Sequence, residues 1–245
     1  VFDGKGGSNR RRKIFPEYKA GRKMSVRLNR HLDVSLTRED EHKMMIRQLN
    51  RLIEYLECLP LTITTMDNIE ADDVIGYSAK HIFKDKCTIM STDKDFLQLV
   101  DERIQVYSPT KKLMYDEERI LNEYGINAKN FLLYRMLDGD KSDGIPGVKG
   151  VGLKTLLKIF PFLESPHKYT LDDLIKSSIP KVKQYKLCAE IIDSEEQMLM
   201  NKKLMDLDDL NISGSSKLKI QDIVEQPIQR MVKHKFQRMF LEDKL

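Results

Sequence analysis

Hydrophobic and polar positions change their period several times along the chain, and each period predicts a different element. Residues 39–59 repeat apolar side chains at helical spacing from Met44 to Leu56, which predicts a long amphipathic helix. Residues 61–67 (LTITTMD) and 87–91 (CTIMS) predict strands, and an acidic stretch that opens a helix follows each of them. Strands that alternate with helices are typical of an α/β fold with a mostly parallel, twisted sheet flanked by helices.

The two ends of the chain depart from this alternation. The opening residues, VFDG, resemble the end of a strand whose beginning is missing, because strands usually run about five or six residues. We therefore expect this sequence to be a fragment. Beyond Asn127 the pattern becomes helical, and a basic helix is expected around residues 228–240.

Composition narrows the classes of function. The 245 residues are 40% hydrophobic and 33% charged, and no apolar run reaches the roughly 20 residues of a membrane span. We therefore expect a globular protein without a membrane partner. Three scattered cysteines favour a reducing compartment. The five histidines lack zinc-type spacing, so any bound metal is expected to have oxygen ligands.

Charge is distributed unevenly along the chain. The net charge is +4, yet residues 1–30 contain ten Lys or Arg against Asp3 and Glu17, which gives +8 there and −4 in the rest. A basic arm on a slightly acidic body favours a phosphate-bearing partner. A solvated, flexible tail is the alternative that charge alone leaves open.

Carboxylates follow the predicted strands at equivalent places. In an open parallel sheet, ligands bind beyond the carboxyl ends of the strands, which is where these acids fall. Complementing a helix dipole is the alternative for any single pair. Converging carboxylates select Mg²⁺ or Mn²⁺, and this many could hold two ions that assist hydrolysis of a phosphodiester by water. The candidates are Asp3, Glu70, Asp72, Asp73, Asp93 and Asp95, joined by Asp140 and Asp143, which share a face on a helical turn.

The stretch MLDGDKSDGIPGVKGVGLKT (136–155) places acids directly beside a run of glycines. Small residues let the backbone approach a phosphate closely, and amides at the start of the next helix can donate to it. A packing turn without a ligand is the alternative. The candidate phosphate-binding residues are Gly147, Gly150 and Gly152, with Lys149 and Lys154 adding charge.

Four motifs resemble the 5′-nuclease superfamily in order and spacing: VFDGKGGSNRRRKIFPEYKAGRK, NIEADD, STDKDFLQLV and LDGDKSDGIPGVKGVGLKT. This superfamily includes bacteriophage 5′-exonucleases, the 5′-nuclease domain of DNA polymerase I type enzymes and the flap endonucleases. The resemblance spans roughly Val1 to Phe160, and it implies that the eight acids named above bind metal, with Asp3, Glu70, Asp72 and Asp73 also in the catalytic set. Its YKxxR motif implies a catalytic Lys19, a Tyr18 that stacks on a base, and Arg22 beside the DNA. The family also has a basic, DNA-binding residue after an FDxKG motif, and in this sequence it corresponds to Arg10 or Arg11.

The resemblance also implies that the chain is divided into three structural regions. Residues 1–130 would form a PIN-like α/β core with a helical arch at about 18–38. Residues 131–205 would form a helix–three-turn–helix subdomain that grips duplex DNA through phosphates, with a possible monovalent cation at its loop. Residues 206–245 would be a C-terminal extension packed on the core.

The chain departs from the family pattern at three places. It starts too late to contain the family's upstream Asp, it has Asp143-Gly144 where Asp-Asn is usual, and it has one extra residue between Asp3 and Tyr18.

Together these features predict a metal-dependent 5′→3′ exonuclease and flap endonuclease. We expect a monomer that acts on 5′ flaps or 5′ ends of DNA, or on RNA–DNA hybrids, in the cytoplasm of a bacterial or phage-infected cell. Two alternatives stay open. One is a PIN-type endoribonuclease, against which the glycine run argues. The other is a non-catalytic DNA-binding relative, against which the eight acids argue.

Overall fold

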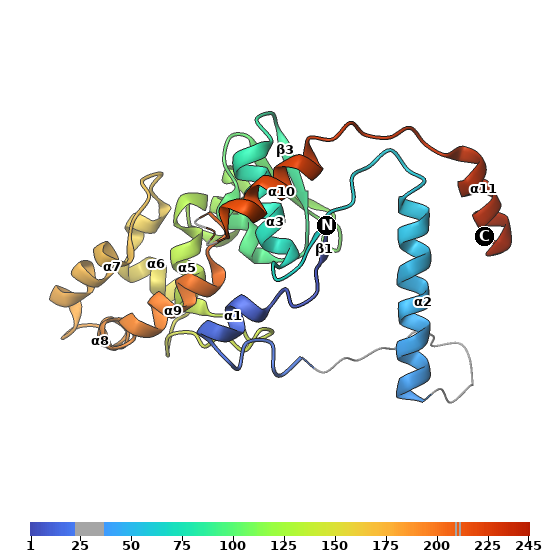
Figure 1. The fold of residues 1–245 in the computed structure, drawn as a ribbon. Coiled ribbons are helices and arrows are strands. Elements are labelled where there is room, and N and C mark those ends of the chain that lie inside the picture. Colours follow the sequence, from blue (N-terminus) through green and yellow to red (C-terminus); the bar gives the residue numbers. More distant parts are fainter. Residues whose placement is uncertain (23–36, 209, 211) are drawn as a thin grey trace. The chain divides into compact units, whose positions relative to one another are not determined.

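The computed structural model describes residues 1–22, 37–208, 210 and 212–245 (Figure 1). The chain forms two compact units, and each is described by itself. Unit one contains Val1–Gly21 and Thr65–Gln221, and unit two contains Arg22–Thr64 and Asp222–Leu245. Most of the expected arch, residues 23–36, lies outside the described residues. The three-part division expected from the sequence stays a prediction.

Helices are the commonest regular elements in both units. Unit one contains α1 (Asn9–Ile14), α3 (Ala71–Tyr77), α4 (Glu117–Tyr124), α5 (Phe131–Asp138), α6 (Leu153–Ile159), α7 (Leu171–Ser178), α8 (Lys186–Asp193), α9 (Glu195–Met205) and most of α10 (Gly214–Val224). Unit two contains α2 (Arg38–Leu56) and α11 (Lys233–Glu242). Within the described residues, no helix is both long and apolar enough to cross a membrane.

The described strands form two small sheets. β1 (Phe2–Asp3) pairs with β2 (Thr65–Met66), and both run in the same direction. β3 (Cys87–Met90) and β4 (Ile104–Ser108) are also parallel, whereas β5 (Leu113–Tyr115) runs antiparallel to β4. The expected α/β architecture is therefore present, and two of the three described strand pairs are parallel, but the described strands lie in two small sheets rather than one, and β5 is antiparallel. The turn from β4 to β5 is too short for the crossover that a parallel pair requires.

The core of unit one lies around β4 and the helices that follow it. Ile104 and Val106 alternate with less buried residues along β4 and are almost completely buried, as expected for a strand with one covered face. Phe96, from the 3₁₀ turn Lys94–Leu99, and Phe131, at the start of α5, complete this core. The loops that follow β3 and α5, where Asp93, Asp95 and Asp140 lie, extend from this core.

The connection between α5 and α6 is hydrogen-bonded to α9. Backbone bonds between Asp140 and Ile145 close a tight hairpin, which we call the acidic hairpin. The buried Asn201 of α9 donates its side-chain amide to the carbonyls of Met136 and Pro146, at 2.9 and 2.8 Å. Both ends of the acidic hairpin are therefore anchored to the same helix.

In unit two, the predicted helix at 39–59 is observed as α2. Its N-cap Thr37 accepts a hydrogen bond from the amide of Asp40. Arg51 pairs with Asp243 at 2.7 Å, and the ring of Tyr55 meets that of Phe236 edge to face, so α11 packs along α2. The predicted C-terminal basic helix is confirmed, although it begins at Lys233 rather than near residue 228.

Candidate active site

The first group of acids lies where β1 and β2 end. Parallel pairing of these strands brings their carboxyl ends to the same edge, and α3 begins there. Asp3 accepts a hydrogen bond from the amide of Ala71 at 2.7 Å, so its carboxylate caps the entry to α3. Glu70, at the N-cap of α3, and Asp73, in its first turn, are buried. The predicted placement of acids at strand ends is thus observed for this group.

A basic residue from α1 neutralises the two buried acids of this group. The guanidinium of Arg11 lies 2.5 Å from Glu70 and 2.7 Å from Asp73, and its Nε donates to the carbonyl of Leu204. Arg10 reaches Asp73 at 3.0 Å from the more exposed side. Burial alone would lower the pKa of Arg11, but Asp73 and Glu70 outweigh burial and raise it. Arg11 therefore stays charged.

Two residues predicted to contact DNA face inward. Tyr18 is 3% exposed, packs against Ile145 and Leu204, and donates its hydroxyl to Glu70 at 3.1 Å. Arg11 is also 3% exposed. In this structure the Tyr18 ring is closed to a stacking base and Arg11 is closed to a phosphate, because both side chains satisfy the buried acids instead. Arg22 is exposed and belongs to unit two.

Lys19 connects the first group of acids to the acidic hairpin. Its ammonium lies 2.7 Å from Glu70, and its backbone amide donates to the carbonyl of Asp143 at 2.8 Å. Its φ is +58°, a conformation that residues other than glycine adopt rarely and that clusters at functional sites. The strained turn places the predicted catalytic amine among the acids of α3.

The second group of acids surrounds Arg135, a residue that sequence reasoning missed. This arginine of α5 is almost buried and contacts Asp95 at 2.6 Å, Asp140 at 2.8 Å and Asp138 at 3.3 Å. Its place in the helix just before the acids, with Asp138 at i+3, was a signal in the sequence. Asp93 lines the same cavity of about 540 Å³ as Arg135 and Asp140.

Electrostatics couples the two groups of acids. Burial and the nearby Asp93 raise the pKa of Asp72 to about 7. Burial likewise raises the pKa of Asp95 to about 6, with Asp93 and Asp140 adding to the effect and Arg135 opposing it. Because Asp93 acts on both, the two groups share one electrostatic environment. Burial would also raise the pKa of Asp140, but Ser142 and Arg135 lower it below its ordinary value.

The donor set fits a hard divalent cation, although the carboxylates are not yet arranged around one. In the described part of the chain, no three Asp, Glu, His or Cys side chains are placed to hold a single metal ion. Arg11, Lys19 and Arg135 instead contact carboxylate oxygens of both groups. The raised pKa values of Asp72 and Asp95 show that these acids lack full compensation, which is the condition that favours binding of a cation.

The glycines after the acidic hairpin have different roles. A Cβ at Gly147 would lie 2.2 Å from the carbonyl oxygen of Asp138, so Gly147 is required by packing rather than by a ligand. Gly150 has φ +81°, and neither Gly150 nor Gly152 has a neighbouring atom within 4 Å of its Cβ position. The backbone at these two positions is open to a ligand. Lys149 and Lys154 beside them are exposed.

Comparison with known proteins identifies the family. Residues 1–125 match the family described as "5'-3' exonuclease, N-terminal resolvase-like domain". The 5'-3' exonuclease of Buchnera aphidicola subsp. Acyrthosiphon pisum is 32% identical over 197 residues, which cover 79% of this chain and 63% of that protein. DNA polymerase I of Bacillus subtilis is 30% identical over 210 residues, covering 83% of this chain and 21% of that protein.

The fold agrees with this match. A structure of the bacteriophage T5 flap endonuclease, solved as a pseudo-enzyme-product complex with DNA and metal ions, superposes with a TM-score of 0.67 at 22% identity. The match covers 99% of this chain and 82% of that one. The chain therefore has the mixed α/β fold of a phage 5′-nuclease, and it belongs to the 5'-3' exonuclease family. It spans 50–63% of the length of the first three curated relatives.

Proposed function

We propose that this protein is a metal-dependent 5′→3′ exonuclease and structure-specific flap endonuclease. The observation that carries the proposal is that Lys19 links the two acidic regions: its ammonium contacts Glu70, and its backbone amide donates to the carbonyl of Asp143. Beside it lie the glycines of residues 147–152, which we call the glycine loop and whose backbone is open at Gly150 and Gly152. Family membership supports the same activity, since the relatives are 5'-3' exonucleases and DNA polymerases I. The substrate is DNA with a 5′ flap or 5′ end, or an RNA–DNA hybrid.

We further propose that the chain acts with Mg²⁺ or Mn²⁺, two ions in the complete site. Asp72 and Asp93 would provide the first ligands, with Asp3, Glu70 and Asp73 on one side and Asp95, Asp140 and Asp143 on the other. The cation would supply Lewis acidity and neutralise charge at the scissile phosphate. Support comes from related T5 nuclease structures that contain metal ions, including zinc.

The chain's own residues supply positioning and charge in this mechanism. Lys19 donates to a nonbridging oxygen of the scissile phosphate and stabilises the charge that develops there. Once Lys19 moves from Glu70 to the phosphate, Glu70 would be free to help hold the cation. The open amides near Gly150 and Gly152, with Lys149 and Lys154, hold duplex phosphates without reading bases. Arg11 and Arg135 keep the acids in place before substrate arrives.

Cleavage of a labelled 5′-flap DNA, with Mg²⁺ and with EDTA, tests the proposal directly. We expect metal-dependent release of the flap and of short 5′ products. Cleavage of single-stranded RNA in preference to the flap would favour the PIN-type endoribonuclease. Flap binding without cleavage at any Mg²⁺ or Mn²⁺ concentration would favour a non-catalytic relative. Sedimentation of the same sample tests the expected monomer, and cell fractionation tests the expected cytoplasmic location.

Substitutions in the glycine loop should affect DNA affinity and stability separately, depending on the position. Gly152→Leu and Lys154→Ala are each expected to weaken duplex affinity with little change in melting temperature. For Lys154→Ala, the slope of the logarithm of affinity against the logarithm of salt concentration should also become smaller in magnitude by about one. The matched variant Gly147→Ala should instead lower the melting temperature, because its Cβ would meet the Asp138 carbonyl. Fluorescence anisotropy at several salt concentrations measures affinity. Unchanged duplex affinity in Gly152→Leu and Lys154→Ala would show that the loop is a packing turn.

Asp72 should make stability depend on pH and on metal. Its folded pKa of about 7 exceeds the ordinary 3.8, so the folded metal-free protein binds the proton more tightly and loses stability as pH rises from about 4 to 7. Asp72→Asn should therefore stabilise the metal-free protein at pH 8, by at most about 4 kcal/mol at about 1.36 kcal/mol per pKa unit. The gain should vanish at pH 4.

Thermal melts in EDTA and in Mg²⁺ measure this effect. Mg²⁺ should raise the melting temperature of the parent more at pH 8 than at pH 5, since the proton and the cation compete for Asp72. Asp72→Asn should lose most of the Mg²⁺ response, whereas the exposed Asp85→Asn should keep it. An equal Mg²⁺ response in the parent and in Asp72→Asn would remove Asp72 from the ligand set.

A further inference from the structure

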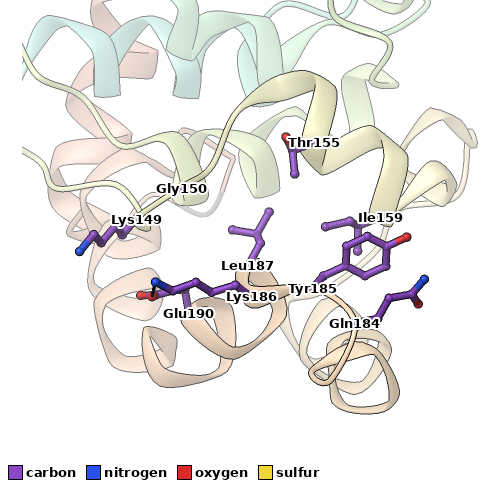
Figure 2. A pocket seen from close by; sticks show the side chains of 9 residues that line it. All are labelled: Lys149, Gly150, Thr155, Ile159, Gln184, Tyr185, Lys186, Leu187 and Glu190. Carbon is purple, nitrogen blue, oxygen red and sulfur yellow. Dashed lines mark ion pairs between the residues drawn. The ribbon is translucent and has the colours of Figure 1, made fainter.

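A cavity of about 390 Å³ lies between α6 and the start of α8, and its lining contains none of the candidate metal ligands (Figure 2). Thr155 and Ile159 of α6 face Tyr185 and Leu187 across it. Gly150, whose backbone is open, lines the same cavity. The volume falls within the range of about 300–1,000 Å³ that is usual for small-molecule sites.

The two ends of this cavity differ in chemistry. Figure 2 shows the ring of Tyr185 and the amide of Gln184 toward one end, and the side chains of Lys149 and Lys186 toward the other. The floor is apolar, because Ile159 and Leu187 are buried there. The cavity therefore combines a surface for a flat, apolar-faced group with a cationic end.

The cationic end retains a net positive charge. Its single acid, Glu190, lies 4.0 Å from the ammonium of Lys186, whose side chain is 84% exposed. A pair at this distance and exposure contributes little, so an anion can displace it at small cost. The segment of chain that spans the lining, residues 149–190, contains eight lysines against four acids.

We propose that this cavity binds one nucleotide, with the base against Tyr185 and the apolar floor and the phosphate between Lys149 and Lys186. An aromatic ring beside cationic side chains is the combination that recognises an unstacked nucleotide. The nucleotide has two possible sources: a terminal base of DNA held at the adjacent glycine loop, or a free 5′-mononucleotide. The DNA source rests on the proposed function, whereas the free nucleotide does not.

Equilibrium dialysis of labelled deoxyadenosine 5′-monophosphate, in EDTA, tests the free nucleotide. We expect saturable binding by the parent, and Tyr185→Leu should weaken it about tenfold or more. Tyr185→Phe keeps the ring and should bind as the parent does. Lys186→Ala should weaken binding and reduce its salt dependence, whereas Lys183→Ala, an exposed lysine outside the cavity lining, should change neither. Thermal melts confirm that each variant is folded.

A second arm tests the DNA source. A duplex with 2-aminopurine as its terminal base should become more fluorescent on binding to the parent, because the base leaves the stack, and Tyr185→Leu should abolish the rise. A signal in either arm that Tyr185→Leu removes supports the inference. The inference is overturned if neither arm responds, or if Tyr185→Leu and Lys186→Ala both behave as the parent. Loss of flap cleavage would overturn the proposed function alone, since neither arm requires cleavage.

Discussion

Replacing Arg11 by alanine is expected to lower the free energy of unfolding by about 3–5 kcal/mol, the usual cost of removing one partner from a buried ion pair. Arg11 is 3% exposed, and it is the shared partner of Glu70 and Asp73, which are themselves 2% and 1% exposed. Without Arg11, two carboxylates remain buried, and among the described residues Lys19 contacts Glu70 and Arg10 contacts Asp73, while Tyr18 still donates a hydrogen bond to Glu70. Chemical denaturation in EDTA, analysed by linear extrapolation, measures the loss.

The neighbouring Arg12 provides the matched control. It lies on the same helix but is exposed, so Arg12→Ala should change stability by less than about 0.5 kcal/mol. Mg²⁺ should restore part of the stability that Arg11→Ala loses, because the freed carboxylates can then bind a cation. An Arg11→Ala variant as stable as Arg12→Ala in EDTA would show that the buried acids do not depend on this guanidinium.

The alternation of strands and acidic helix starts was sufficient to predict where the acids lie. Asp3 does end β1 beside the start of α3, where its carboxylate accepts from the amide of Ala71, next to Glu70. This part was predictable because strand direction and helix capping are local properties of the sequence, and both put carboxylates at the same edge. The long helix α2 was predictable for the same reason, since its pattern repeats over several turns.

The direction in which Tyr18 and Arg11 point could not be predicted from local pattern. Both lie in a strongly basic segment, which suggests exposure to solvent or to DNA. Their burial depends on Glu70 and Asp73, more than 50 residues away, whose charges need a partner inside the fold. A buried carboxylate without a cation is costly, so tertiary pairing outweighed the tendency of a basic run to face water.

The separate roles of the glycines also could not be predicted from the sequence pattern. Gly147 and Gly150 lie in one motif at three-residue spacing, and nothing in the sequence separates them. Only the backbone around each one shows that a side chain at Gly147 would strike the Asp138 carbonyl, while Gly150 faces open space. The antiparallel direction of β5 could not be predicted either, because it follows from a short turn rather than from the residues of β5.

Lys19→Ala is expected to lower the single-turnover cleavage rate about 100-fold or more, with little change in DNA affinity. This is the scale observed when one electrostatic stabiliser of a transition state is removed. The expectation follows from the position of the ammonium, which lies 2.7 Å from Glu70 and is largely buried among the acids that we propose hold the metal. Rates at saturating protein, with affinity measured separately in Ca²⁺ or EDTA, separate the two effects.

Two further variants separate the ammonium from the backbone turn that carries it. Lys19→Gly should relieve the strain of φ +58° yet lose as much activity as Lys19→Ala, because both lack the amine. Lys13→Ala, an exposed lysine on α1, should keep the parent rate and at most weaken binding. If Lys19→Gly retained the parent rate at saturation, the turn rather than the charge would matter. If Lys19→Ala lost affinity instead of rate, Lys19 would be a phosphate contact and the chemistry would rest on the acids alone.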